Sequence, residues 1–165
     1  MTLRVAVVTV SDRSARGERE DRSGPILAEA VAASGAEVVR RELVSDDEQG
    51  LAGLLAAICD APDAPDLVLT TGGTGLGPRD RAPEATRRAC ARLVPGIAET
   101  LRARSLAVTP HAMLSRGEAG VRGATLIVNL PGSPGGARDG WEIVSQIAAH
   151  AASQLHGGDH RRRER

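Results

Sequence analysis

A glycine-rich segment carries the residues best suited to binding a ligand. In LVLTTGGTGLGPRD (67–80), a short apolar run leads into a loop with glycines at 72, 73, 75 and 77. Glycine tolerates positive φ and has no Cβ atom, so successive backbone N–H groups can point into one anion-binding concavity. Thr71 and Thr74 add hydroxyl donors. We predict a phosphate site here, with a tight strand-to-helix turn as the alternative, since the spacing matches neither the dinucleotide fingerprint nor the P-loop.

A carboxylate closes this loop and raises the question of a metal ion. Asp80 stands directly after Pro78 and Arg79. A carboxylate beside a bound phosphate repels it unless a cation lies between them, and Mg²⁺ is commonly held by one or two carboxylates together with phosphate oxygens. The alternative is that Asp80 caps a helix that begins near Pro83. Both interpretations stay open at this point.

Two adjacent aspartates raise the same question in an earlier loop. Asp46 and Asp47 stand in VSDDEQ, just before an amphipathic helical pattern. Asp46 with Gln49, or Ser45 with Glu48, has the spacing of a capping box. Helix capping is the simpler interpretation, but adjacent aspartates can divide capping and ligand binding between them.

Two further loops follow strand patterns and carry polar groups. Ser11 and Asp12 come directly after the first strand, and Ser133 stands within NLPGSPGG (129–136), each with a structural turn as the alternative. Candidate phosphate clamps are Arg79, Arg81 and Arg116. The four histidines offer no partner set for a metal, because glycines interrupt the His156–His160 pair.

Composition excludes several classes of function. All 21 basic residues are arginine, so a P-loop lysine and a lysine that forms a Schiff base are both ruled out. The chain has no Phe or Tyr and a single tryptophan, Trp141, which argues against single-strand binding by stacked aromatics. The formal net charge is zero. We therefore expect no nucleic-acid partner.

Strand and helix patterns alternate along the chain. Strands are predicted at 3–10, 36–43, 67–71 and 124–130, and helices from Ser23 to Gly35, over 45–60, 83–93 and 95–106, and through a face formed by Trp141, Val144, Ala148, Ala151 and Leu155. Residues 110–121 read as irregular or as a short hairpin. This order predicts right-handed βαβ units in a three-layer α/β/α sandwich with a mostly parallel sheet. Ligands bind such sheets beyond the carboxyl ends of the strands, where the three loops above begin.

The chain reads as one domain over residues 1–157, followed by a flexible, arginine-rich tail over 158–165. No apolar run approaches the roughly 20 residues of a membrane helix, and the N-terminus lacks the features of a signal peptide. Cys59 and Cys90 are isolated within helical patterns. Isolated cysteines are typical of a reduced protein, so we expect a cytoplasmic location without membrane contact.

The loops together resemble a known family. TVSDR, DRSGP, TTGGTGLGPRD, PEATR, LSR and NLPGSPGG occur in this order. They are similar to the corresponding segments of the MogA/MoaB family of molybdenum cofactor biosynthesis, and the similarity extends over roughly residues 3–160. One departure concerns the first carboxylate: the family segment usually reads Val-Pro-Asp, whereas Ser45 replaces the proline here, so that Asp46 and Asp47 compete for the same role.

The resemblance implies an α/β/α fold, a homotrimer, and transfer of AMP from ATP to the phosphate of molybdopterin with Mg²⁺ as cofactor. The product would pass to a molybdate-inserting protein of the MoeA type. By resemblance, Asp46 and Asp80 would be the catalytic and metal-binding carboxylates. The substrate-binding residues would be Ser11, Asp12, Thr71, Gly72, Gly73, Thr74, Gly75, Ser115, Arg116, Pro131, Gly132 and Ser133.

Two other functions compete with this one. Some members of the family keep the fold without catalysis, so a molybdopterin-binding module or oligomeric scaffold is the main alternative. A different nucleotide- or phosphate-binding enzyme on the same fold is the second. A nicotinamide oxidoreductase is disfavoured, because no Gly-x-Gly-x-x-Gly follows the first strand. The presence of both carboxylates favours the enzyme.

Overall fold

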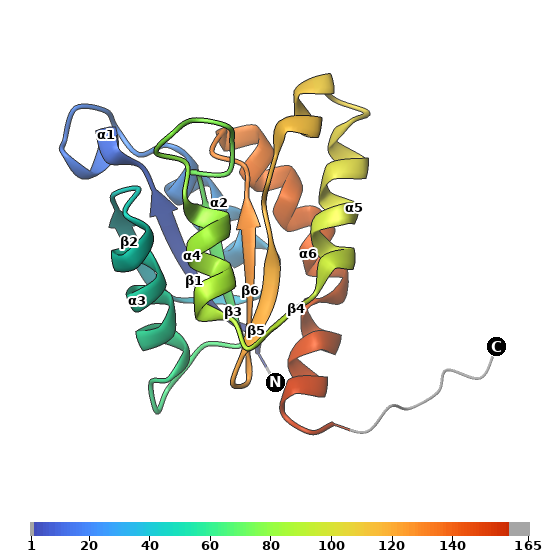
Figure 1. Cartoon of the computed structure of the whole chain (residues 1–165). Helices are drawn as coiled ribbons and strands as arrows, with labels where there is room; N and C mark the ends of the chain where they lie inside the picture. The colour runs from blue at the N-terminus through green and yellow to red at the C-terminus, as the bar shows by residue number, and fades with distance from the viewer. Residues whose placement is uncertain (1, 159–165) are drawn as a thin grey trace.

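A six-stranded sheet forms the centre of the molecule in the computed structural model, which describes residues 2–158 (Figure 1). The strand order is β2-β1-β3-β6-β5-β4. β2, β1, β3 and β6 are parallel, whereas β5 runs antiparallel to both of its neighbours. The strands are β1 (Arg4–Val10), β2 (Glu37–Val44), β3 (Leu67–Thr71), β4 (Arg92–Leu93), β5 (Ala119–Arg122) and β6 (Thr125–Leu130).

Helices cover both faces of this sheet. One face packs against α2 (Ser23–Ala33), α5 (Pro95–Ser105) and α6 (Pro134–Leu155), and the other against α3 (Glu48–Cys59) and α4 (Ala82–Ala89). Two short helices, α1 (Asp12–Ala15) and the 3₁₀ helix η1 (Pro110–Leu114), lie at the carboxyl end of the parallel strands (Figure 1). The predicted three-layer sandwich with a mostly parallel sheet is therefore confirmed.

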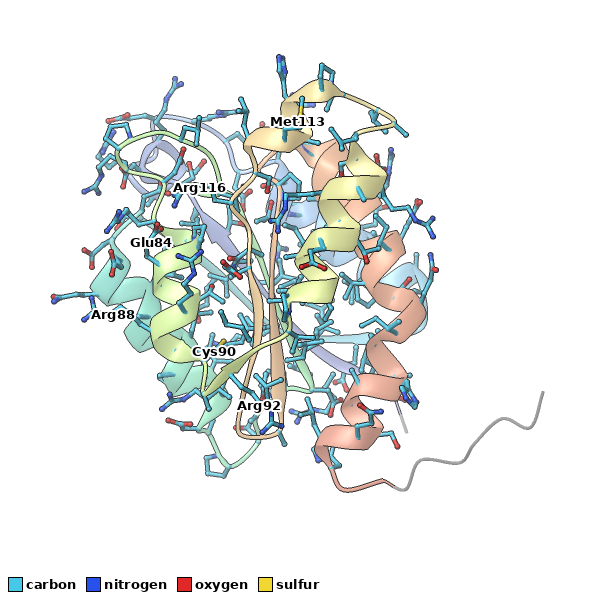
Figure 2. The ribbon with its side chains drawn as sticks, turned by 45° about the vertical axis from the view of Figure 1, so that its right-hand side comes forward. Glu84, Arg88, Cys90, Arg92, Met113 and Arg116 are labelled. Atoms are coloured by element: carbon cyan, nitrogen blue, oxygen red, sulfur yellow. The ribbon has the colours of Figure 1, made fainter. Side chains whose placement is uncertain are left out.

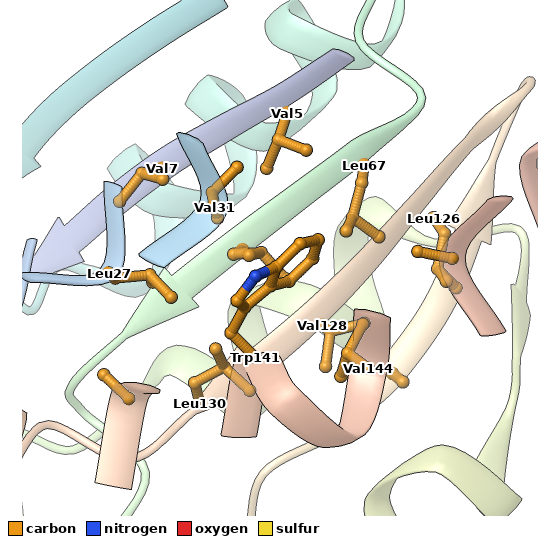
Figure 3. Packing of buried hydrophobic residues seen from close by; sticks show 14 of the residues in the cluster. Val5, Val7, Leu27, Val31, Leu67, Leu126, Val128, Leu130, Trp141 and Val144 are labelled. Atoms are coloured by element: carbon orange, nitrogen blue, oxygen red, sulfur yellow. The ribbon is translucent and has the colours of Figure 1, made fainter. Parts of the chain in front are cut away.

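Two apolar clusters explain why the central strands are apolar on both faces. Along β3, Leu67 and Leu69 belong to the cluster under α2 and α6, while Val68 belongs to the cluster under α3 and α4. A strand buried on both sides needs an uninterrupted apolar run. Trp141 is only 3% exposed and fills the centre of the first cluster, against Leu67 and Val144 (Figure 3).

One predicted boundary was wrong at the antiparallel edge of the sheet. The helix predicted over 83–93 ends at Ala89, and Arg92–Leu93 instead form β4 against β5. A Cβ at Gly120 would lie 2.6 Å from Cys90 Sγ and 2.8 Å from the Arg92 carbonyl oxygen. Because Gly120 has no Cβ, β4 and β5 can come close enough to pair. The segment 110–121, predicted as irregular or a hairpin, contains η1 and then β5, which forms a hairpin with β6.

The start of α2 also differs from its prediction. Asp21 Oδ1, and not the Ser23 side chain, accepts a hydrogen bond from the backbone N–H of Gly24 at 3.0 Å. Asp21 Oδ2 accepts a hydrogen bond from the Thr9 hydroxyl at 2.8 Å. The capping carboxylate is thereby fixed to the end of β1. The predicted end of this helix is confirmed, since Gly35 follows it with φ of +84°.

None of the helices described over residues 2–158 is long and apolar enough to cross a membrane. The predicted tail lies mostly outside the described residues, as do His160 and the arginine run over 161–165. His156, the other member of the predicted histidine pair, contacts the Asp66 carboxylate at 2.8 Å instead, at the end of the sheet opposite the loops.

Candidate functional site

Three loops meet where β1, β3 and β6 end. A Cβ at Gly72 would lie 2.3 Å from the carbonyl oxygen of Val10, and one at Gly132 would lie 3.1 Å from the Gly72 Cα. The Thr71 hydroxyl donates to the carbonyl of Pro131 at 2.7 Å. The glycines are therefore required, because the backbones of all three loops touch. Thr71, predicted to bind the ligand through its hydroxyl, uses that hydroxyl within the fold.

The glycine loop over 72–80 bends sharply at its start. Gly72 and Gly73 have successive φ values of +102° and +66°, a conformation that side chains bearing a Cβ rarely adopt. The Gly73 carbonyl accepts from the Ala82 N–H at 3.1 Å, and Gly77 accepts from the Asp80 N–H at 3.0 Å. The loop is thus closed on itself by backbone contacts, and its role as a phosphate site stays a prediction.

Asp46 lies under this loop with one carboxylate oxygen unused. The side chain is buried, and its Oδ2 accepts from the Asp12 N–H at 2.9 Å, while the Asp46 N–H donates to Asp12 Oδ1 at 3.0 Å. Asp46 Oδ1 is buried without a hydrogen-bond partner among the described residues, and a Cβ at Gly73 would lie 2.7 Å from it. An unsatisfied carboxylate oxygen of this kind fits a cation.

The electrostatics of Asp46 agree with a missing positive charge. Burial raises the pKa of its carboxyl above the ordinary value, and repulsion from Asp12 and Asp80 raises it further, although the hydrogen bond from Asp12 acts in the opposite direction. A cation beside Oδ1 would reverse this shift. The Asp46 carboxylate lies against Gly73 and the Asp80 carboxylate against Gly75 and Gly77, so both predicted carboxylates border the same glycine loop.

The two adjacent aspartates have separate roles. Asp47 caps α3, since its Oδ2 accepts from the Gly50 N–H at 2.6 Å. The capping interpretation therefore holds for Asp47, and Asp46 is left for the site. Asp80 does not cap α4: that helix has no side-chain cap, and Asp80 Oδ2 accepts from Gly77 N–H within its own loop at 2.8 Å.

Arg79 joins the glycine loop to the loop after β1. Its Nε and Nη2 donate to the two oxygens of Asp12 at 2.9 and 3.0 Å. This hydrogen-bonded pair, opposed by burial, holds the pKa of Asp12 below its ordinary value. The Arg79 side chain is 65% exposed, so its guanidinium is open to an anion. Asp12, predicted to bind substrate, is occupied by Arg79 and by the Asp46 backbone.

Arg116 lies on the opposite side of the same loop. Its backbone N–H donates to the Thr74 carbonyl at 2.8 Å, and its guanidinium contacts carbonyl groups of the loop. Glu84 in the first turn of α4 pairs with that guanidinium. Neither the residue spacing nor the family resemblance assigned a role to Glu84. Its only signal was its place in PEATR, and the sequence does not show which of the many arginines it pairs with.

Two cavities border the loop segment 131–133. The larger, about 710 Å³, lies between the glycine loop, the η1 region and the start of α6, and its lining includes Thr74, Gly75, Ser115, Pro131 and Ser133. The smaller, about 360 Å³, is lined by Ser11, Asp21, Thr71, Gly72, Gly132 and Ser133, among others. Ser133 lines both, while its hydroxyl caps α6 by accepting from Gly136 N–H at 3.1 Å. Asp21 lines the smaller cavity, although the sequence patterns did not single it out as a candidate.

The predicted site residues therefore gather at one end of the sheet, but no preformed metal centre exists among them. Within residues 2–158 no three histidine, cysteine, aspartate or glutamate side chains come together in a way that could hold a metal ion. Any divalent cation here would need oxygens from a ligand, as Mg²⁺ sites with phosphates usually do.

Known proteins share both the sequence and the fold. Residues 6–150 match the family model described as a probable molybdopterin binding domain. The molybdopterin adenylyltransferase of Helicobacter pylori J99 is 39% identical over 145 residues, covering 87% of this chain and 82% of that protein. Its counterpart in Escherichia coli K12 is 35% identical over 158 residues, covering 94% and 80%.

A solved structure of a related protein has the same fold. The molybdopterin biosynthesis enzyme MoaB from Thermus thermophilus superposes with a TM-score of 0.87 at 49% identity, covering 94% of this chain and 98% of that one. The chain belongs to the MogA/MoaB family of molybdopterin-binding domains.

Proposed function

We propose that this chain is a molybdopterin adenylyltransferase of molybdenum cofactor biosynthesis. It transfers AMP from ATP to the phosphate of molybdopterin and releases pyrophosphate. The observation that carries the proposal is the placement of Asp46 and Asp80 at the two ends of one glycine loop, with Asp46 Oδ1 buried and unpaired. Relatives named for this activity, of which the chain covers about four fifths, support it.

The reaction asks for positioning more than for covalent chemistry. An oxygen of the molybdopterin phosphate attacks the α-phosphorus of ATP, a new P–O bond forms, and the bond to pyrophosphate breaks. No general base is required, because a phosphate monoester is largely ionised at neutral pH. The two cavities share Ser133, so two substrates bound in them would meet at the loop segment 131–133. Holding them there removes the entropic part of the barrier.

Side chains and backbone N–H groups of this chain suit the negative charge of the phosphates. Arg79 offers an exposed guanidinium, and the glycine loop offers backbone N–H groups in a protein that has no lysine. The residues present fit Mg²⁺: Asp46 Oδ1 and the Asp80 carboxylate would hold it together with phosphate oxygens. When bound, it would neutralise charge on the phosphates.

The non-catalytic module is the weaker candidate. A binding module needs no unpaired buried carboxylate, which costs stability in the absence of a ligand. Both carboxylates are present, and the relatives compared above are named as enzymes. Within the part of the chain that the structure describes, no contact or cavity favours the module over the enzyme.

Pyrophosphate release tests the proposal. Purified protein would be given ATP, Mg²⁺ and freshly prepared molybdopterin, with omission of molybdopterin as a control. Asp80→Asn should keep the fold, since the amide oxygen can still accept from Gly77 N–H, and should lose nearly all turnover. The matched control is Asp63→Asn, an exposed aspartate in the turn at the opposite end of the sheet. Full activity of Asp80→Asn would refute its role.

Three further features belong to the proposal and rest on the family resemblance. We expect a homotrimer, hand-over of the adenylylated product to a molybdate-inserting protein of the MoeA type, and a cytoplasmic location. Cys59 and Cys90 are both free thiols, as a reducing compartment requires. Sedimentation velocity of the purified chain distinguishes a trimer from a monomer.

A further inference from the structure

Arg116 donates to the glycine loop at two separated points. Its Nε donates to the carbonyl of Gly75 at 2.7 Å, and its Nη2 donates to the carbonyl of Asp80 at 2.6 Å. The Arg116 N–H adds a third contact to the loop, to the Thr74 carbonyl at 2.8 Å. One planar guanidinium thereby fixes the distance between the middle of the loop and the residue that carries its carboxylate.

Glu84 holds this guanidinium in place. Its carboxylate pairs with Nη1 of Arg116 and lies 3.5 Å from Nη2. Figure 2 shows Glu84 at the start of α4, next to Arg116. The two side chains are only 21% and 32% exposed, so the pair is partly shielded from water. Burial is the largest single influence on Glu84 and raises its pKa, but the hydrogen bond from Arg116, a backbone hydrogen bond and the charges of Arg116 and Arg81 together bring the pKa below the ordinary value.

We propose that Glu84 and Arg116 are positioning residues, which act on the reaction by holding the glycine loop and Asp80 in place. Arg116 then serves the substrate through the loop, and not as a direct phosphate ligand. Its donors point to two loop carbonyls and to Glu84, whereas the Arg79 side chain is 65% exposed and does not contact these carbonyls. This inference rests on the proposed function.

The kinetic test uses pyrophosphate release by Glu84→Gln, Arg116→Lys and the double variant. A displaced Asp80 should lower kcat about 10-fold or more, because misplacement by a fraction of an ångström to about 1 Å has effects of that order, with little change in KM for ATP. The double variant should be no worse than the single ones. If Arg116→Lys raises KM for ATP while Glu84→Gln matches the wild type, Arg116 is a direct ligand and the proposal fails.

The matched control is Glu118→Gln. Glu118 also pairs with an arginine of α4, Arg87, and is similarly shielded at 17% exposure, but that pair does not reach the glycine loop. Its kinetic constants should equal those of the wild type. Equal losses in Glu118→Gln and Glu84→Gln would show that any ion pair on α4 matters, which contradicts a specific role.

Hydrogen–deuterium exchange separates this inference from the proposed function. The backbone amides of 75–80 should exchange faster in Glu84→Gln and Arg116→Lys than in wild type or Glu118→Gln, without substrate present. Unchanged exchange in both variants would overturn the inference even if wild-type turnover is high. Faster exchange with no wild-type turnover would support the positioning role and count against the assigned activity alone.

Discussion

At the scale of single residues, Asp46 carries a cost that function explains. Its pKa is raised by burial and by the charges of Asp12 and Asp80, so the folded chain binds this proton more tightly than the unfolded chain. Stability therefore falls as the pH rises from the ordinary value near 3.8 through the raised value. Above that range, the full destabilisation by the ionised carboxylate is present.

We therefore expect Asp46→Asn to raise Tm at pH 7 while abolishing turnover. The amide oxygen can accept from the Asp12 N–H as before, and the amide nitrogen replaces the unpaired Oδ1. The gain should shrink as the pH falls through the raised pKa of Asp46 and should be gone below the ordinary value near 3.8. Thermal unfolding from pH 3 to 8 measures this, and a variant less stable than wild type at pH 7 would contradict it.

The neighbouring aspartate should behave in the opposite way. Asp47 caps α3 through the Gly50 N–H, and loss of such a cap typically costs about 0.5–2 kcal/mol of unfolding free energy. Asp47→Ala should show this cost in urea denaturation and should keep turnover near that of the wild type. A loss of turnover as deep as that of Asp46→Asn would show that the roles of the two aspartates are reversed.

At the scale of elements, the close meeting of β1, β3 and β6 should make Gly72 irreplaceable. Gly72→Ala meets both a positive φ and the carbonyl oxygen of Val10 at 2.3 Å. Positive φ alone costs about 1–3 kcal/mol, and the overlap must move a strand end in addition. Gly35→Ala is the control, with a φ of +84° but nothing within 4 Å. Equal unfolding free energies for the two variants would refute the backbone overlap.

The elements show what sequence can and cannot predict. Central strands such as β3 were predictable because burial on both faces demands an apolar run. β4 was not, because its pairing depends on the contact between Gly120 and Cys90, 30 positions apart. The loops of the site followed from topology, since parallel strands end at one edge.

The separate roles of Asp46 and Asp47 could not be predicted from the sequence, because the capping-box spacing fits either residue. Glu84 was missed because its partner is 32 residues away.

At the scale of the whole molecule, residues 2–158 should unfold as one unit. β3 contributes side chains to both apolar clusters, so the layers on the two faces share one sheet. Trp141 is the only aromatic residue of the Phe, Tyr and Trp types, and it lies in the cluster under α2 and α6. Its fluorescence therefore reports on that layer alone, whereas far-ultraviolet circular dichroism also reports on α3 and α4.

We expect the two signals to follow one coincident urea transition, as a cooperative domain requires. If the chain is a homotrimer, the shared midpoint should also rise with protein concentration, because association stabilises the folded state by mass action. Loss of circular dichroism before the fluorescence change would mean that α3 and α4 unfold separately from the layer that holds Trp141. Because Asp46 precedes α3 and Asp80 precedes α4, such uncoupling would also detach the two carboxylates from the cavities beside α6, and single-domain catalysis would require another explanation.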